Sequence, residues 1–453
     1  MQQPSRDDLE RWDRQHVWHA FTQMAAYEPL LLERGQGSKL FDIDGRELLD
    51  GVSSLWCNVH GHRHPHIDAA IRDQLDRVAH TTLLGASNSS TIRLARRLVE
   101  LTPAGLEHVF FSSDGASAVE VAIKLALQYW RQCPRPQPAK ICYVALADAY
   151  HGDTIGGVSV GGVERFHAMF EPLLFEVLRL PRPGLYRLPP SVTAATACEH
   201  YLAQAEALLA EHHARIAAFV IEPLVQAAAG IVTHPPGYLR GLRELTRRHD
   251  VLLIADEVAV GFGRTGTLFA CQQEEVSPDL LCLGKGLTGG YLPMAATLAS
   301  DEIYRAFLAP YEQSRQFFHG HTYSGNPLAA AAALASLEVF EQDAVLERLP
   351  AKIACLAQHL ARISQHSHVG DVRQCGLMAG IELVRDRQTQ EPYPWAEGRG
   401  LRACRVALEH GVLLRPLGNV LVVMPPLAVS LEELDQIMLS VERGIEAATE
   451  ART

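Results

Sequence analysis

Residues 251–290 read VLLIADEVAVGFGRTGTLFACQQEEVSPDLLCLGKGLTGG. It contains two short apolar runs, 251–255 and 280–283, each followed by chemically distinctive residues. The first runs into Asp256, and the second runs into Lys285, which stands between two glycines. Continuous apolar runs bounded by turn residues are typical of strands that are buried on both faces of a parallel sheet. Because ligands bind beyond the carboxyl ends of such strands, we expect the acid and the amine to face one crevice.

The pairing of Lys285 with Asp256 indicates chemistry rather than surface charge. A ligand can approach the lysine closely, because neither glycine neighbour carries a side chain. This arrangement suggests a lysine that captures a carbonyl group, with the acid pairing to a cofactor nitrogen. Taken alone, the acid would be interpreted as a helix cap or turn former and the lysine as a solvated charge. The two together, with these flanks, favour the functional interpretation.

Length and composition restrict the class of protein. The chain has 453 residues, more than one hydrophobic core usually holds, so we expect one large and one small domain or two domains. A net charge of −11 argues against nonspecific binding to nucleic acid or to anionic membranes. Nine scattered cysteines, with no CxxC pair, favour reduced thiols and a cytoplasmic location. Residues 1–16 are polar and charged, so no signal peptide is expected, and no apolar run is long enough for a membrane span.

Strand-like and helix-like segments alternate from about residue 105 to residue 300. This pattern predicts an α/β fold with a doubly wound, mostly parallel sheet. The C-terminal part has the composition of a smaller α+β domain. We therefore divide the chain into an N-terminal segment of the small domain (1–60), a large cofactor-binding domain (61–335) and a C-terminal small domain (336–453). The first and last pieces are expected to pack together, because neither has enough apolar residues for its own core.

A candidate phosphate site follows the short apolar run 109–111. Small residues at 112–117, among them Gly115 and Ala116, lead from this strand into an amphipathic helix. A helix that begins in this way presents free backbone N–H groups and the positive end of its dipole to an anion. Any capped helix in an α/β domain looks similar, and the P-loop and GxGxxG patterns are absent here.

Other polar residues follow predicted strands. Tyr150 comes after the strand near 141–144 and is suited to stacking on a planar ring, although a structural tyrosine is an equal alternative. Glu222 and Gln226 follow the apolar run that ends at residue 221. Arg415 ends another apolar run, where a guanidinium suits bidentate carboxylate binding or a structural ion pair.

Four histidines alternate at positions 60, 62, 64 and 66. Their spacing matches no common zinc pattern, so we predict no metal site.

The motifs together resemble one family over nearly the whole chain: the class III pyridoxal-phosphate aminotransferases. The segments that carry the resemblance are DEVAVGFGRTG (256–266), GKGLTGG (284–290), YHG (150–152), EPLVQ (222–226) and TYSGNP (322–327). The resemblance implies the fold type I of pyridoxal-phosphate-dependent transferases and a homodimer with shared active sites.

The resemblance also implies roles for individual residues. Lys285 would form an aldimine with pyridoxal 5'-phosphate and move protons in a ping-pong transamination, while Asp256 would keep the pyridine nitrogen protonated. Tyr150 would lie over the cofactor ring, as a third catalytic residue. The further cofactor contacts implied are Gly115, Ala116, Glu222, Gln226, His321 and Thr322, the last two from the partner subunit. The substrate contacts implied are Trp56, Tyr150, Lys285, Gly320 and Arg415.

Within the family, the segments WHAFTQM (18–24), DGVSSLW (50–56) and RPLG (415–418) are similar to the 7,8-diaminopelargonic acid aminotransferases of biotin synthesis. These enzymes transfer an amino group to 8-amino-7-oxononanoate, most often from S-adenosylmethionine, and one branch uses lysine. Three positions depart from the common pattern. Ala116 replaces a Ser or Thr, so that Ser117 or backbone amides would compensate at the phosphate, whereas Phe21 and Val422 replace tyrosines near the donor.

Three functions follow as hypotheses. The first is the biotin-pathway aminotransferase, with S-adenosylmethionine or lysine as donor. The second is an ω-amino acid or amine:pyruvate aminotransferase of the same family. The third, a non-catalytic binding protein with the same fold, is disfavoured because Lys285 and Asp256 are both present.

Overall fold

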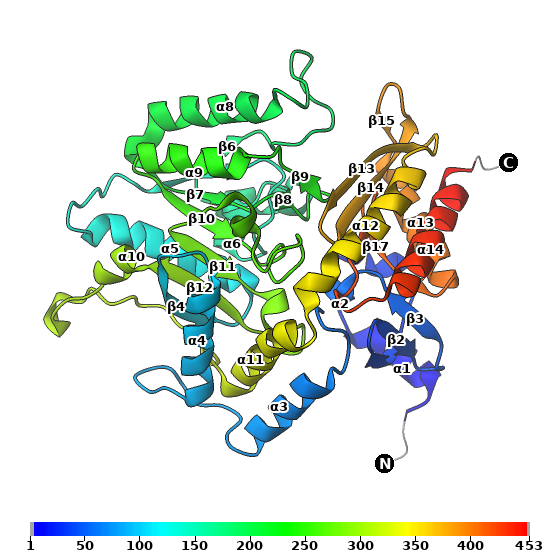
Figure 1. Cartoon of the computed structure of the whole chain (residues 1–453), viewed down its shortest axis with the longest axis horizontal. Coiled ribbons are helices and arrows are strands. Elements are labelled where there is room, and N and C mark those ends of the chain that lie inside the picture. Colours follow the sequence, from blue (N-terminus) through cyan, green and yellow to red (C-terminus); the bar gives the residue numbers. More distant parts are fainter. Residues whose placement is uncertain (1–3, 451–453) are drawn as a thin grey trace.

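A seven-stranded sheet forms the centre of the computed structural model, which describes residues 4–450 (Figure 1). Its strand order is β4-β12-β11-β10-β7-β5-β6. The strands are β4 (Leu106–Ser112), β5 (Cys142–Leu146), β6 (Val177–Leu180), β7 (Ile216–Ile221), β10 (Leu252–Asp256), β11 (Leu280–Leu283) and β12 (Ala295–Ser300). Only β12 pairs antiparallel with its neighbours β11 and β4, which confirms a mostly parallel α/β sheet.

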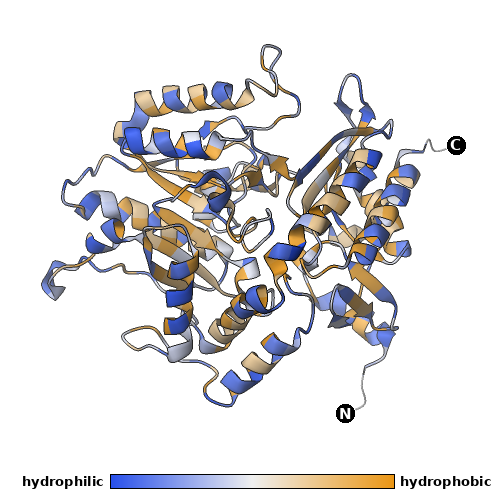
Figure 2. Ribbon diagram, viewed as in Figure 1, coloured by the Kyte–Doolittle hydropathy of each residue, from blue (hydrophilic) through white to orange (hydrophobic). Residues whose placement is uncertain are grey.

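The central strands are buried on both faces, as their continuous apolar runs predict. Leu253 and Ala255 of β10 belong to one hydrophobic cluster, while Leu252 and Ile254 belong to another. Neighbouring residues therefore point to opposite faces of the sheet, as the period of a strand requires. Figure 2 shows these strands as predominantly hydrophobic, whereas the helices around them alternate between hydrophobic and hydrophilic residues.

Helices cover the two faces of this sheet. Helix α5 contributes to the cluster with Leu252, whereas α8 and α9 contribute to the cluster with Leu253. The longer helices are α1 (Arg6–His16), α3 (Pro65–Leu75), α4 (Ser89–Leu101), α5 (Gly115–Gln132), α8 (Ala197–His212), α9 (Tyr238–Arg248), α11 (Pro327–Gln342), α12 (Val345–Ile363), α13 (Arg399–Glu409) and α14 (Leu431–Thr449). Within residues 4–450, no helix is long and apolar enough to cross a membrane.

The two ends of the chain share one small sheet. Its order is β1-β2-β3-β16, and β16 (Val412–Leu413) pairs in parallel with β3 (Glu47–Asp50). Figure 1 shows the blue N-terminal strands beside the orange and red C-terminal elements. The remaining strands of this region are β1 (Leu32–Gln36), β2 (Lys39–Asp42), β13 (Val369–Cys375), β14 (Met378–Asp386), β15 (Glu391–Pro392), β17 (Arg415–Leu417) and β18 (Val420–Val423). The domain boundaries after residues 60 and 335 stay a prediction.

A buried arginine links the central segment to both ends of the chain. Arg264 is 1% exposed and donates from Nη1 to the Pro425 carbonyl oxygen at 2.6 Å. Its Nη2 donates to the Asn58 carbonyl oxygen at 2.8 Å. Burial lowers the pKa of Arg264 to about 10, which leaves it charged at neutral pH. The side chain therefore fixes the seam at which N-terminal, central and C-terminal segments meet.

Candidate active site

A cavity of about 630 Å³ lies at the carboxyl ends of the central strands. The loops that follow β4, β5, β7, β10 and β11 contribute to its wall, as is usual for ligand sites in parallel sheets. Among its lining residues are Trp56, Ser113, Gly115, Ala116, Tyr150, His151, Glu222, Asp256, Val258 and Lys285. The structure thus brings together in one cavity most of the residues that the sequence indicated.

Lys285 enters the cavity from the turn after β11. Its φ of 41° is in the left-handed region, which is strained for a residue with a side chain. Its Nζ lies 5.4 Å from the centroid of the Trp56 ring. Burial lowers the pKa of Lys285, and the nearby carboxylates of Asp256 and Glu222 oppose that effect. A lowered pKa increases the fraction of neutral amine, which is the form that attacks a carbonyl.

Asp256 ends β10, the strand that pairs in parallel with β11. Its Oδ2 is 2.7 Å from Nδ1 of His151, and its Oδ1 accepts a hydrogen bond from the Val258 amide at 3.0 Å. Both side chains of the His151–Asp256 pair are buried. The carboxylate is therefore held in a fixed orientation beside Lys285. Sequence reasoning gave His151 no role, although its place directly after Tyr150 at a strand end was a signal.

The start of α5 forms the candidate phosphate site. Asp114 caps the helix, because its Oδ1 accepts from the amide of Ser117 at 2.9 Å and from its hydroxyl at 3.0 Å. The Ser117 hydroxyl is thus engaged in the cap, which leaves the first amides of the helix as anion donors. A Cβ on Gly115 would lie 2.5 Å from Cγ1 of Val258, so glycine is required for this close approach. A Cβ on Gly152 would lie 2.3 Å from that of Ala116, so this wall is equally tight.

Tyr150 and Glu222 are connected at the side of the cavity. The Tyr150 hydroxyl donates to Oδ2 of Asp153 at 2.7 Å, and burial together with this carboxylate raises the pKa of Tyr150. Glu222 accepts from the Tyr150 amide at 3.3 Å and from the Ala227 amide at 2.9 Å. Burial raises the pKa of Glu222 to about 7. Glu222 therefore stabilises the cavity wall, because its two oxygens accept hydrogen bonds from the backbone amides of Tyr150 and Ala227.

Five predicted site residues do not line the cavity within one chain. Gln226 lies behind the wall and donates to the Ala147 carbonyl oxygen at 2.8 Å. His321 lies next to the phosphate site, where its Nδ1 is 3.0 Å from Oγ of Ser113. Gly320, Thr322 and Arg415 are also outside the lining. The roles of these residues remain predictions.

An aromatic row joins Arg415 to the cavity. The Arg415 guanidinium is 5.9 Å from the centroid of Phe21, which packs edge-on against Phe166 at 5.3 Å. Phe166 in turn lies 6.5 Å from the ring of Tyr150. Val422, in contrast, is only 1% exposed and belongs to a small apolar cluster on which Trp56 packs. Phe21 therefore lies outside the cavity lining, two ring contacts away from Tyr150, whereas Val422 belongs to the buried cluster that supports Trp56.

The cavity fits the expected cofactor by its donor set. A pyridine aldehyde with a phosphate group needs an amine for the aldehyde, an acid for the ring nitrogen and anion donors for the phosphate. Lys285, Asp256 and the first amides of α5 supply these groups. Gly115 is the first residue of α5 and lines the cavity, so its backbone is among the groups that face the phosphate position.

Comparison with known proteins agrees with this geometry. The profile of the class-III aminotransferase family matches residues 22–445. The chain is 49% identical over 445 residues to the adenosylmethionine-8-amino-7-oxononanoate aminotransferase of Geobacter sulfurreducens, covering 97% of this chain and 98% of that protein. It is 53% identical over 445 residues to the enzyme of the same name from Nitratidesulfovibrio vulgaris, covering 98% and 82%.

Solved structures give the same fold with two different activities. The adenosylmethionine-8-amino-7-oxononanoate aminotransferase of Methanocaldococcus jannaschii superimposes with a TM-score of 0.92 at 42% identity, covering 98% of this chain and 99% of that one. An (S)-enantioselective omega-transaminase from Thermomicrobium roseum superimposes with a TM-score of 0.93 at 35% identity, covering 99% and 100%. Overall shape does not separate these activities, whereas sequence identity is higher to the first.

Proposed function

The chain belongs to the class-III aminotransferase family, and from this premise we propose that it aminates 8-amino-7-oxononanoate to 7,8-diaminononanoate in biotin synthesis. The observation that carries the reaction type is the pairing of Lys285 with Asp256 at the ends of adjacent parallel strands in one cavity. The observation that carries the substrate is the near full-length identity of 49–53% to relatives named for this reaction.

The cofactor of this pyridoxal-phosphate-dependent family supplies an aldehyde and an electron-withdrawing ring. Lys285 acts as nucleophile and proton carrier, since burial increases its neutral fraction. Asp256, oriented by His151, holds a proton on the ring nitrogen. The first amides of α5 bind the phosphate, and Tyr150 closes the side of the cavity. Trp56 forms the opposite wall beside Lys285, where the substrate chain would pass.

S-adenosylmethionine is the proposed amino donor, because the relatives are named for it. Lysine is the second candidate, since Phe21 provides no hydroxyl on the side of the cavity that the aromatic row joins to Arg415. An ω-amino acid or amine donor with pyruvate is the third, supported by the structural similarity to an omega-transaminase. For each of these reactions, Arg415, at the end of the aromatic row, would bind the substrate carboxylate.

We also propose a homodimer in which Gly320, His321 and Thr322 complete the partner's site. Two neighbouring loops, 76–88 and 306–326, support it, because Nδ2 of Asn88 at the end of the first donates to the Gly325 carbonyl oxygen of the second at 3.3 Å. Leu84 in the first loop is 90% exposed and Tyr323 in the second is 61% exposed. Large exposed apolar side chains of this kind favour an interface. A cytoplasmic location remains the expectation from the thiol content, and all nine cysteines are free.

The decisive experiment is turnover of the purified holoenzyme with 8-amino-7-oxononanoate and separate donors. We expect product with S-adenosylmethionine, and product only with lysine would identify the second candidate. Faster amination of pyruvate by simple amines would favour the third. Lys285→Ala should lose the visible absorption of the bound cofactor together with activity, whereas Lys352→Ala should retain both, because Lys352 lies outside the cavity. No turnover of 8-amino-7-oxononanoate with any donor would contradict the proposal.

A further inference from the structure

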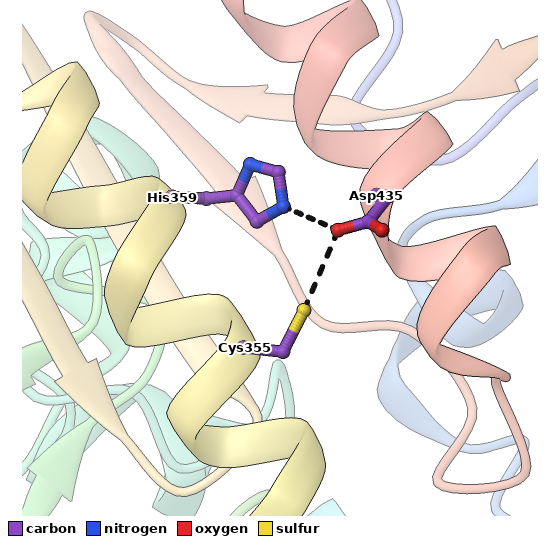
Figure 3. A group of neighbouring side chains, drawn as sticks. All are labelled: Cys355, His359 and Asp435. Carbon is purple, nitrogen blue, oxygen red and sulfur yellow. Dashed lines mark hydrogen bonds and ion pairs between the residues drawn. The ribbon is translucent and has the colours of Figure 1, made fainter.

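A second group of reactive side chains lies between α12 and α14, outside the cavity (Figure 3). Cys355 and His359 are one turn apart on α12, and Asp435 faces them from α14. The Oδ1 of Asp435 lies 2.6 Å from Nε2 of His359 and 3.5 Å from Sγ of Cys355. All three ligand atoms are within 4.8 Å of one another. Sequence reasoning found no Cys/His ligand spacing and predicted no metal site. The Cys-x3-His pair is visible in the sequence, but its third member comes from a distant helix.

We propose that Cys355, His359 and Asp435 form a binding site for a divalent transition-metal ion such as Zn²⁺. A thiolate, an imidazole and a carboxylate are all zinc ligands, and positions i and i+4 present two of them on one helix face. The thiolate and the carboxylate together balance the two charges of the ion. When the ion binds, the thiol proton leaves to solvent. The open side of the cluster, next to the exposed Asp435, leaves a fourth position for water.

The spacing requires only a small adjustment. A tetrahedral zinc ion holds nitrogen and oxygen ligands at about 2.0–2.2 Å, which separates two such atoms by roughly 3.3 Å. The hydrogen bond between His359 and Asp435 must therefore open by less than about 1 Å. The Asp435 side chain is 55% exposed, so it can turn without disturbing the core. His359 is 9% exposed, so helix packing holds its ring in place.

Arg362 opposes the ion and must move. Its Nη2 donates to Nδ1 of His359 at 2.9 Å, which places the ring proton on Nε2, facing Asp435. When the ion binds at Nε2, the ring proton lies on Nδ1 instead. Nδ1 then becomes a donor and no longer accepts a hydrogen bond from Arg362. The same Arg362 nitrogen donates to Oε1 of Glu442 at 2.6 Å, and the Arg362 side chain is 58% exposed. When Arg362 swings outward, Glu442 becomes the carboxylate acceptor for Nδ1–H, an arrangement common around metal-binding histidines.

The test uses the tag-free holoenzyme, treated with a chelator and then titrated with Co²⁺. We expect the visible bands of a tetrahedral cobalt centre with a thiolate ligand, saturating at one ion per chain, and their loss on adding Zn²⁺. Cys355→Ser and His359→Gln should each weaken binding by roughly tenfold or more. Cys198→Ser and His108→Ala are matched controls, because the first removes another half-buried thiol and the second alters the other cluster of possible ligands, Glu107–His108–Asp301.

Zn²⁺ should also raise the melting temperature of the wild type but not that of Cys355→Ser, because the ion would connect α12 to α14. Circular dichroism of each variant shows whether the fold is retained. The proposal is overturned if the wild type gives no such bands with equimolar Co²⁺, or if the bands persist in both Cys355→Ser and His359→Gln. A cobalt spectrum without thiolate bands that disappears only in His108→Ala would place the ion at the other cluster and would overturn the proposal equally.

Discussion

At the scale of single residues, His151 orients the carboxylate of Asp256. Its ring is buried against Asp256, and its Nε2 has no hydrogen-bond partner among the described residues. The one hydrogen bond of the His151 ring, between Nδ1 and Oδ2 of Asp256, therefore orients this side of the Asp256 carboxylate. His151 touches the cavity, but it acts on the proposed reaction through Asp256.

We expect His151→Ala to lower kcat/KM by about 10- to 100-fold, since a hydrogen bond to a charged group contributes about 1.5–3 kcal/mol. His151→Asn should recover part of this loss, because its amide nitrogen occupies a position near Nδ1. Steady-state kinetics and cofactor titration would measure both effects. Equal kcat/KM and equal cofactor affinity in His151→Ala and wild type would contradict the assigned role.

His234 gives the protein a predicted sensitivity to acid. Neither ring nitrogen has a partner among the described residues, and burial lowers the pKa of His234 from 6.5 to about 3. Below pH 6.5 the unfolded chain binds a proton that the folded chain does not bind until about pH 3. The free energy of unfolding therefore falls as the pH is lowered through this window, by up to about 1.4 kcal/mol per pH unit.

His234→Phe should remove this contribution, because phenylalanine fills a similar volume beside Tyr238 and does not titrate. Urea unfolding at a series of pH values between 6.5 and 4 would show a shallower loss of stability in the variant. His60, whose pKa burial also lowers to about 3, provides the same background in both proteins. Parallel stability curves for the two proteins would refute the assignment.

Sequence could locate Lys285 and Asp256 because each follows an apolar run that becomes a buried strand. The same reasoning could not find the role of His151, since that role depends on a contact between residues 105 positions apart. Val422 is the opposite case. The family resemblance placed it near the amino donor, whereas in the structure its side chain is buried in the cluster on which Trp56 packs.

At the scale of elements, the turn that carries Trp56 depends on a buried acid. Ser53, Ser54 and Trp56 all have φ between 52° and 64°, which is strained for residues with side chains. The Asp50 carboxylate, fully buried, accepts from the Ser54 amide at 2.8 Å and is 2.9 Å from Nε2 of His62. These bonds compensate the strain and fix the wall beside Lys285.

Asp50→Asn should raise KM for the amino acceptor more than it lowers kcat, because Trp56 shifts while Lys285 and Asp256 remain in place. The stability loss should be about 1–3 kcal/mol, the cost of a poorly satisfied buried polar group. Asp42→Asn is the matched control, since Asp42 accepts backbone N–H groups in the adjoining hairpin without contacting this turn. Steady-state kinetics and thermal unfolding would measure both effects. Equal effects of the two variants would contradict a specific role of Asp50 in holding the turn that carries Trp56.

Two of the elements that the sequence analysis did not predict, β13 and α1, have clear physical reasons. β13 reads VGDVRQC, and its partly buried Arg373 bonds to Asp371 at 3.1 Å and to Glu382 of β14 at 2.7 Å. Hydrophobic periodicity does not detect a strand whose half-buried positions are occupied by an ion-pair network. α1 has no buried residue and is defined by its Ser5–Asp8 capping box, a signal present in the sequence. The central strands were predictable, because burial on both faces makes them continuously apolar.

At the scale of the whole molecule, the homodimer proposal implies that one chain alone provides an incomplete site. Lys285, Asp256 and the start of α5 lie in the cavity, whereas Thr322 does not. The loop that carries Thr322 includes the exposed Phe318, which is 75% accessible in the single chain. If a second copy of the chain buries this loop, Thr322 of the first chain comes to lie at the phosphate site of the second copy. The homodimer proposal requires this arrangement.

Mixing two defective variants tests this arrangement. Lys285→Ala lacks the amine, and Thr322→Ala is expected to bind the cofactor more weakly. If Thr322 acts on the partner's site, a heterodimer contains one site with Lys285 from one chain and Thr322 from the other. Random reassembly after mild denaturation should then restore about a quarter of the wild-type sites, since half of the dimers are mixed and each has one intact site. Cofactor binding and turnover at limiting cofactor would measure the recovery against unmixed controls.

If Thr322 acts within its own chain, mixing gives no such sites, because each chain then lacks one of the two groups. Sedimentation of the wild type supplies the independent check, and a monomer that binds cofactor tightly would refute the shared site.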